Sequence, residues 1–150
     1  MEGLYYEDFE EGMTFTTPGR TITETDLVLF TGISGDLSEL HTNEEFAKTT
    51  VFGQRLCHGM LGVSVVTGLM TRSGVFERVI AMLGINNWKF LKPLFVGDTV
   101  HVRFQITEKR LSNSNPKAGI IGRYYELINQ NNEVIQKGEI PAMVLRRNTL

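Results

Sequence analysis

The segment Ser34–His41 contains the residue types of an acid–base site. Asp36 precedes His41 by five positions, and imidazole is the side chain that titrates nearest neutral pH. We expect the segment to form a polar, glycine-bearing loop between two helices, a frequent setting for binding and catalysis. Short spacings of this kind also occur without function, so one alternative stays open. In it, Asp36 caps a turn and His41 satisfies a backbone carbonyl.

A second candidate lies at Cys57–Met60, where a long apolar stretch begins. If a helix starts there, its first N–H groups have no partner within the helix and lie at the positive end of its dipole. Gly59 would let a ligand carbonyl come close to the backbone, so this position could stabilise a developing oxyanion. The alternative is that Gly59 only makes a tight turn into the helix.

The other reactive side chains are expected to have structural roles. His58 adjoins apolar residues and is assigned a structural place, although it could line the site beside Gly59. Cys57 is expected in the core, because a reactive thiol needs an accessible, electropositive setting. His101 falls on the polar face of a strand. Three scattered histidines and one cysteine show no zinc-ligand spacing, so we predict no metal site.

The first helix that must position these groups is predicted over residues 23–34. Thr23 and Asp26 form a capping box at its start, and three apolar residues recur on one face. Gly32 and Gly35 are expected to end it. This places the end of the helix directly before Asp36.

Two more helices follow in the sequence. Thr42 and Glu45 form a capping box that opens a short helix over residues 43–48. The stretch 59–73 is too long for a typical strand, and its apolar residues surround a helical axis. We predict a buried core helix there, with Gly59 at its first turn.

Strand patterns dominate from residue 79 onward. Apolar and polar residues alternate, as in half-buried strands, over residues 79–91, 100–107, 118–129 and 133–145. Gly97–Asp98 and Asn131–Asn132 are predicted turns, the latter a two-residue hairpin loop. Pro141 must lie at a sheet edge or a bulge. Trp88 and Phe90 share a strand face and are expected to pack, with lining an apolar pocket as the alternative. The sum is an α+β fold.

Composition limits the classes of protein. The 150 residues suit a single domain over residues 1–150. Apolar residues make up 41% and the net charge is −2, which is typical of a globular chain. With no excess of positive charge, we expect no nucleic-acid or membrane partner. The single cysteine and the acidic N-terminus, which lacks signal-peptide features, predict a reducing, cytoplasmic location.

Taken together, these segments resemble the MaoC-like dehydratases, which include the (R)-specific enoyl-CoA hydratases. Five segments match in order: Tyr6–Gly12 (the opening strand), Thr21–Asp26 (the start of the first helix), Ser34–Ala47 (the hydratase motif), Cys57–Leu61 (the start of the central helix), and Phe90–Pro93 with Gly97–Val100 (a strand-turn-strand signature).

The resemblance implies a hot-dog fold, in which a curved antiparallel sheet wraps a long central helix, and a homodimer. It implies that Asp36 and His41 add water to a 2-enoyl thioester of coenzyme A or acyl-carrier protein, without a cofactor. The N–H of Gly59 would hold the thioester oxygen. Ser38 and Glu39 stand where the motif has Asn-Pro, so Ser38 would contact substrate with a shorter polar group. The alternatives are a hot-dog acyl-CoA thioesterase, since fold does not fix function, and a non-catalytic acyl-binding partner subunit.

Overall fold

The structure is a computed structural model that describes residues 3–147. The outermost residues of the domain expected over 1–150 lie outside the described residues. The helices are a 3-10 helix at Tyr6–Asp8, α1 (Glu24–Ser34), α2 (Glu39–Thr42), α3 (Glu44–Lys48) and α4 (Gly59–Arg72). The strands are β1 (Thr14–Thr16), β2 (Arg20–Thr21), β3 (Val79–Met82), β4 (Asn86–Phe90), β5 (Thr99–Leu111), β6 (Ala118–Ile128), β7 (Val134–Glu139) and β8 (Ala142–Leu145).

The strands form one antiparallel sheet in the order β1-β5-β6-β7-β4, with β8 paired to β6 and β3. Two of the predicted strands are each divided in two. The run at 79–91 breaks between β3 and β4, and the run at 133–145 breaks at Ile140 and Pro141. Pro141 has no N–H to donate to a ladder, and its place in this break agrees with the prediction.

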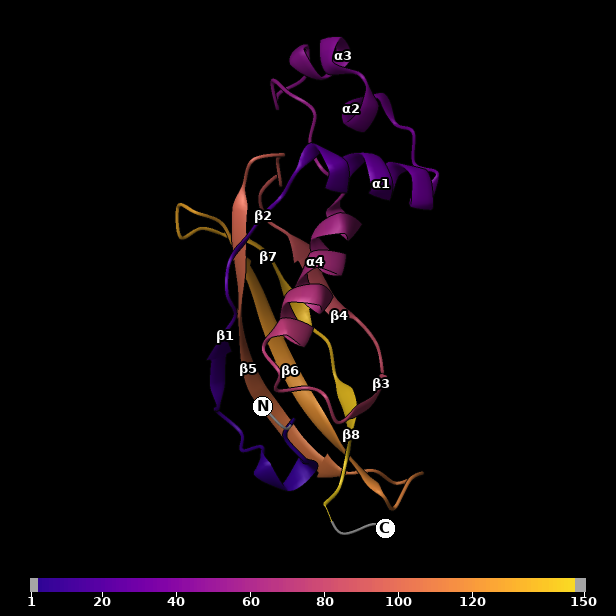
Figure 1. Ribbon diagram of the computed structural model, residues 1–150, viewed down its shortest axis with the longest axis vertical. Helices are drawn as coiled ribbons and strands as arrows, with labels where there is room; N and C mark the ends of the chain where they lie inside the picture. The colour runs from indigo at the N-terminus through magenta and orange to yellow at the C-terminus, as the bar shows by residue number, and fades with distance from the viewer. Residues whose placement is uncertain (1–2, 148–150) are drawn as a thin grey trace.

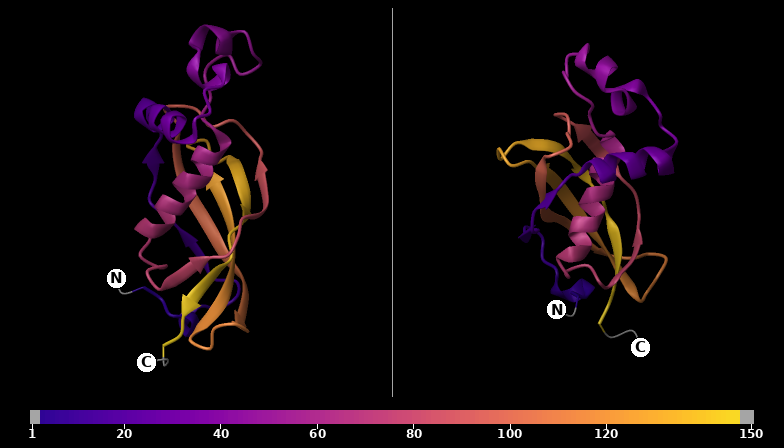
Figure 2. Two further views of the ribbon diagram at one scale, coloured as in Figure 1. Left: turned by 90° about the vertical axis from the view of Figure 1, so that its right-hand side faces the viewer. Right: turned by 45° about the horizontal axis from the view of Figure 1, so that its top comes forward.

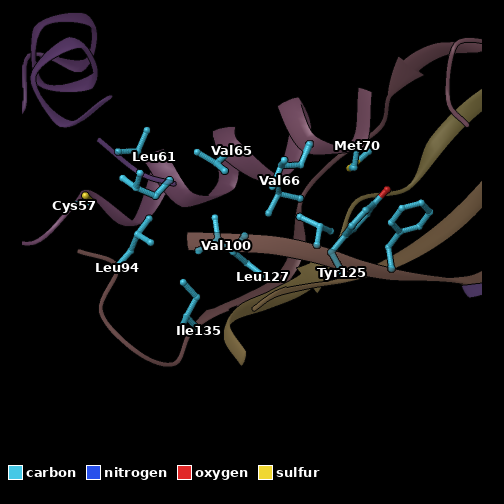
Figure 3. Packing of buried hydrophobic residues seen from close by; sticks show 14 of the residues in the cluster. Cys57, Leu61, Val65, Val66, Met70, Leu94, Val100, Tyr125, Leu127 and Ile135 are labelled. Atoms are coloured by element: carbon cyan, nitrogen blue, oxygen red, sulfur yellow. The ribbon is translucent and has the colours of Figure 1, made fainter. Parts of the chain in front are cut away.

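Helix α4 lies along one face of the curved sheet (Figures 1 and 2). Its buried side chains meet those of β5, β6 and β7 in the main core (Figure 3). The α+β prediction is therefore confirmed, as is the helix over 59–73. One detail differs: Met60, Ser64 and Gly68 are exposed. Helix α4 thus buries one wide face against the sheet instead of being surrounded.

The predicted helix starts are confirmed in one case and wrong in the other. Thr23 caps α1 and forms the capping box with Asp26. Thr42 does not cap α3, because it lies in α2. The cap is Asn43, whose side chain accepts from the N–H of Phe46. An Asn side chain satisfies a free helix N–H as well as Thr does, so two neighbouring candidates could not be separated by pattern alone.

Three smaller expectations are corrected. Gly32 lies inside α1, and Gly35 alone ends it, with a φ of 70°. The opening segment begins with the 3-10 helix Tyr6–Asp8 instead of a strand. The β6–β7 loop is longer than two residues and runs from Asn129 to Glu133. Asn129 fastens it by accepting from the N–H of Glu133, and such local bonds allow longer loops.

Residues 24–55, which carry α1, α2 and α3, form a separate layer that we call the cap. The cap lies beyond the N-terminal end of α4 and away from most of the sheet (Figures 1 and 2). It rejoins the core directly after Leu56: the N–H of Leu56 donates to the carbonyl of Leu40 in the cap, and that of Cys57 donates to the carbonyl of Leu94 in the core. Within the described residues, no helix combines the length and apolarity that crossing a membrane requires.

Candidate functional site

Asp36 is held in a tight turn directly after α1. Its Oδ1 accepts from the backbone N–H of Ser38 at 3.2 Å, so the turn-capping role considered from the sequence is real. The other carboxylate oxygen, Oδ2, lies 3.9 Å from Nε2 of His41 and 3.8 Å from Nε2 of His58. The side chain is 53% exposed. One oxygen therefore anchors the residue, and the other faces two imidazoles.

His41 lies in α2 and points back toward Asp36. Its Nδ1 is 2.6 Å from the carbonyl oxygen of Leu56. A carbonyl only accepts, so Nδ1 carries the hydrogen and Nε2 of the neutral ring keeps a free lone pair on the side of Asp36. His41 thus does contact a backbone carbonyl, as the alternative interpretation of the sequence expects, and its Nε2 also faces the carboxylate of Asp36. The carbonyl contact fixes the tautomer that a general base needs.

His58 completes the cluster, although the sequence assigned it a structural place. Its side chain is 4% exposed, its Nε2 lies 3.1 Å from the carbonyl oxygen of Asp36, and its ring stacks on that of His41 with centroids 3.7 Å apart. The contact joins the cap to the start of α4. The signal in the sequence was the His-Gly pair at the head of the core helix.

Gly59 is the first residue of α4, so its N–H has no acceptor within the helix. It lines a cavity of about 550 Å³ together with apolar residues of the cap end, α4 and the β4–β5 loop and with the polar Lys92 and Gln136, whereas Asp36 and His41 lie outside this lining. A Cβ at Gly59 would come within 2.7 Å of the Phe90 ring, so glycine leaves room there. Phe90 lines this cavity, which favours the pocket-lining alternative, while Trp88 donates from Nε1 to Gln136.

Ser38 contributes through its backbone. Its side chain is exposed and makes no hydrogen bond as a helix cap, whereas its N–H holds Asp36 and its carbonyl accepts from the N–H of His41. Glu39 occupies the first position of α2, and its carboxylate accepts from the side-chain amide of Asn43. Ser38 and Glu39 therefore shape the turn between Asp36 and His41.

Asp36, His41 and His58 are also the group that could hold a metal ion, since their ligand atoms lie within 4.8 Å of one another. The hydrogen on Nε2 of His58, which the carbonyl of Asp36 requires, occupies one of the three ligand atoms. The arrangement fits hydrogen bonding better than coordination. The grouping could not be predicted from the sequence because His58 lies 22 positions after Asp36 and 17 after His41.

Cys57 is buried in the core, as the sequence predicts. Burial, followed by the negative charge of Asp98, raises the pKa of its thiol to about 12. A thiol in that state supplies almost no thiolate at neutral pH. Nucleophilic catalysis by Cys57 therefore finds no support.

A family model described as "MaoC like domain" matches residues 8–124. The chain is 31% identical over 148 residues to the (R)-specific enoyl-CoA hydratase of Rhodospirillum rubrum, covering 95% of this chain and 93% of that protein. It is 37% identical over 109 residues to Protein MaoC of Klebsiella aerogenes, covering 73% of this chain but only 32% of that longer protein.

Solved structures similar to this one include members of the same family. The MaoC-like dehydratase from Rhodospirillum rubrum superposes with a TM-score of 0.86 at 26% identity, covering 97% of this chain and 99% of that one. A conserved hypothetical protein from Mycobacterium tuberculosis, described as a double hotdog fold, gives a TM-score of 0.88 at 23% identity. That match covers 99% of this chain and 46% of the other. The hot-dog fold expected from the sequence is confirmed.

Proposed function

The chain belongs to the MaoC-like dehydratase family, and from this membership we propose that it adds water to 2-enoyl-CoA thioesters. In reverse it would dehydrate 3-hydroxyacyl-CoA thioesters. The observation that carries the proposal is the pair of facing atoms, Oδ2 of Asp36 and the free Nε2 of His41, 3.9 Å apart. The name of the Rhodospirillum rubrum relative, an (R)-specific enoyl-CoA hydratase, supports the same reaction.

The facing atoms suit one water molecule. Hydrogen bonds of about 2.8 Å from a single water reach two groups at this separation. The carboxylate of Asp36 accepts one hydrogen of the water, and Nε2 of His41 accepts the other. A water held by two acceptors has its remaining lone pairs directed away from them, toward a substrate carbon. Such general-base activation contributes about 10²–10⁴ in rate.

The reaction balances without a cofactor. The water oxygen bonds to C3 of the enoyl group while its proton passes to Nε2 of His41, and the pair then returns one proton to C2. Between these steps negative charge gathers on the thioester oxygen. The N–H of Gly59, at the positive end of α4, would donate to that oxygen. Substrate atoms would reach it through the cavity that Gly59 lines.

The segment Leu56–Gly59 supports this division of roles. The carbonyl of Leu56 fixes His41, the ring of His58 stacks on His41, and Gly59 follows directly in the cavity wall. The water-activating pair and the oxyanion donor are thus attached to the same four residues. A shared attachment keeps their spacing fixed, which catalysis by orientation requires.

We also propose a homodimer. Strand β4 is an end of the strand path, paired only to β7. Apolar side chains on and near β3 and β4 are exposed: Ile80, Met82, Leu83, Ile85, Phe90 and Leu91. Exposed apolar edges are usually covered, and a two-fold partner is the commonest cover. Sedimentation should give twice the chain mass. A monomer at micromolar concentration would contradict the dimer but not the hydratase.

The function is tested by the loss of enoyl-thioester absorbance with crotonyl-CoA, for wild type, Asp36→Asn and His41→Ala. Free thiol is assayed in parallel. We expect hydration by the wild type, a drop of about 10²–10⁴ in both variants, and no thiol release. Thiol release without hydration would identify a thioesterase. Tight binding of crotonyl-CoA without turnover would identify an acyl-binding subunit, and crotonyl-acyl-carrier protein in place of crotonyl-CoA separates the two carriers.

A further inference from the structure

His58 is the buried imidazole of the site that the proposed chemistry leaves unused. It is the N-cap residue of α4, but its side chain makes no capping bond to the helix. Instead the ring turns toward the cap, where it contacts the rings of His41 and Phe30. The His41 ring stacks at 3.7 Å and the Phe30 ring is tilted at 5.1 Å. A polar ring in such a place needs a reason other than helix capping.

The contacts of His58 define its tautomer. Nε2 faces the carbonyl oxygen of Asp36 at 3.1 Å and must donate to it. Nδ1 is buried and has no hydrogen-bond partner. A hydrogen on Nδ1 would be an unsatisfied buried donor, which is more costly than a bare lone pair. The ring is therefore the Nε2–H form, with its one hydrogen aimed at the backbone of Asp36.

The hydrogen bond from His58 reaches Asp36 from outside its own turn. The other hydrogen bonds of Asp36 stay within that turn: its N–H donates to Oγ of Ser34, and its Oδ1 accepts from Ser38. Among the hydrogen bonds of the described residues, the one from His58 is what ties Asp36 to α4. Without that bond, an exposed turn would carry the carboxylate alone.

We infer that His58 is a positioning residue that holds Oδ2 of Asp36 opposite Nε2 of His41. Its N–H fixes the Asp36 backbone, and its ring face sets the plane of His41. The tilted ring of Phe30 also contacts the His58 ring. One side chain at the head of the core helix therefore sets the spacing of both groups in the cap. This inference rests on the proposed function.

The test compares His58→Phe and His58→Gln in crotonyl-CoA hydration. Phenylalanine keeps a flat ring for stacking but has no N–H. Glutamine restores an N–H at a similar reach but has no ring. We expect His58→Phe to lower kcat by about 10²-fold, the usual cost of a misplacement of about 1 Å, with KM within about a factor of two. His58→Gln should recover roughly tenfold of that loss, the value of one backbone hydrogen bond.

The matched control is His101→Gln. It removes a histidine of β5 that lies neither in the group Asp36, His41 and His58 nor in the lining of the cavity at Gly59. It should keep the wild-type kcat. A folded His58→Phe enzyme with kcat within twofold of wild type would overturn the inference. So would a variant whose loss lies entirely in KM, because positioning of the reacting pair acts on kcat.

A second readout does not need turnover. Ring-nitrogen NMR of wild-type protein labelled with ¹⁵N-histidine should show the hydrogen of His58 on Nε2 and a bare Nδ1. A hydrogen on Nδ1 would overturn the inference even if neither variant folded. If the wild type failed to hydrate crotonyl-CoA, the proposed function would fall, while the ring spectrum would still decide whether His58 holds Asp36.

Discussion

The cap and the α4–sheet core are built in opposite ways. In the core, α4 and the strands β5, β6 and β7 share one cluster of side chains that water does not reach. In the cap, the buried side chains are Leu27, Thr31 and Ala47, of which Leu27 packs into the main core, and apolar residues such as Ile33 and Val51 are exposed. The candidate catalytic pair lies in the cap, and the position of the pair is set from the core.

This difference separates two demands on one chain. Burial of apolar area supplies most of the free energy of folding, so the core determines whether the molecule folds. The cap adds little burial, but in the proposed reaction it would present the carboxylate of Asp36 and the imidazole of His41 to substrate. The joint at Leu56–Gly59 must do both: it packs in the core and it holds the side chains of the cap in place. Variants in the cap should therefore alter activity, variants in the core should alter stability, and variants at the joint should alter both.

The largest expected effect comes from Asp36→Asn. Asparagine keeps the oxygen that accepts from Ser38 and replaces the one that faces the imidazoles. We expect hydration of crotonyl-CoA to fall by about 10²–10⁴-fold, because the water loses an acceptor. The free energy of unfolding in urea should stay within about 0.5 kcal/mol of wild type, as for exposed sites. A loss of unfolding free energy well above about 0.5 kcal/mol would contradict this and show that the cap is part of the folding core.

The same contrast decides how much the sequence could predict. Alternation along β5 predicted that Val100, Val102, Phe104 and Ile106 are buried, and all four are. Periodicity reports the two faces of one element, so it succeeds where one face meets a core. It also predicted too much burial for α4, because periodicity does not show where a neighbouring layer ends.

The joint between cap and core could be predicted only in part. The pair Asp36 and His41 was found because both lie in one short segment. His58 was assigned a structural place from its apolar neighbours, since its contacts with His41 and Asp36 reach across 17 and 22 positions of sequence and no local pattern reports such contacts. The turn role of Ser38 was missed for another reason: its backbone N–H does the work, and residue type does not encode that.

The next largest effect is expected in the core, from Gly62→Ala. A Cβ at Gly62 would lie 2.2 Å from Nε2 of Gln136, a buried amide that also donates to the carbonyl of Gly59 and accepts from Trp88. The amide cannot move without breaking these bonds. Overpacking of this kind costs about 1–3 kcal/mol, which urea unfolding would measure.

Gly68→Ala is the matched control, on the exposed side of the same helix. A Cβ there meets nothing within 4 Å, so the higher helix propensity of alanine should raise stability by up to about 1 kcal/mol. Equal destabilisation by both variants would contradict the view that α4 packs by one face only.

A third effect, about 1.4 kcal/mol, should appear in the pH dependence of the unfolding free energy, through Cys57 in the joint. The pKa of the buried Cys57 thiol is raised to about 12 from an ordinary value of 9.0. Above pH 9 the unfolded chain releases this proton and the folded chain keeps it. Stability is therefore fully present below pH 9 and falls by about 1.4 kcal/mol between pH 8 and pH 10.

Cys57→Ala isolates this contribution, since it removes the thiol and leaves the other titrating groups in place. The difference in unfolding free energy between wild type and variant should shrink by that amount from pH 8 to pH 10. A difference that stays constant would mean that the thiol is solvated in the folded state, and that the joint is more open than the core.

The smallest expected effect concerns what holds the cap together. Arg55 donates from its two terminal nitrogens to the carboxylate of Glu24 in α1, at 2.9 and 3.0 Å, and from Nε to Glu44 in α3, at 2.8 Å. Exposed ion pairs contribute about 0–1 kcal/mol and weaken in salt. Arg55→Ala should therefore lower global stability by less than about 1 kcal/mol, and hydrogen exchange should speed up in α3 but not in α4.

Lys48→Ala removes an exposed ion pair of the same kind, but one that joins Lys48 only to Glu45 within α3. If Arg55 acts as a clamp between elements, exchange in α3 speeds up in Arg55→Ala alone, and high salt applied to wild type reproduces the effect. If both variants behave alike, exposed charge does not order the cap. The contacts at Leu56–Gly59 and the packing of Leu27 into the main core would then have to hold it, and the kinetic effect of His58→Phe would have to be accompanied by faster exchange throughout α1, α2 and α3.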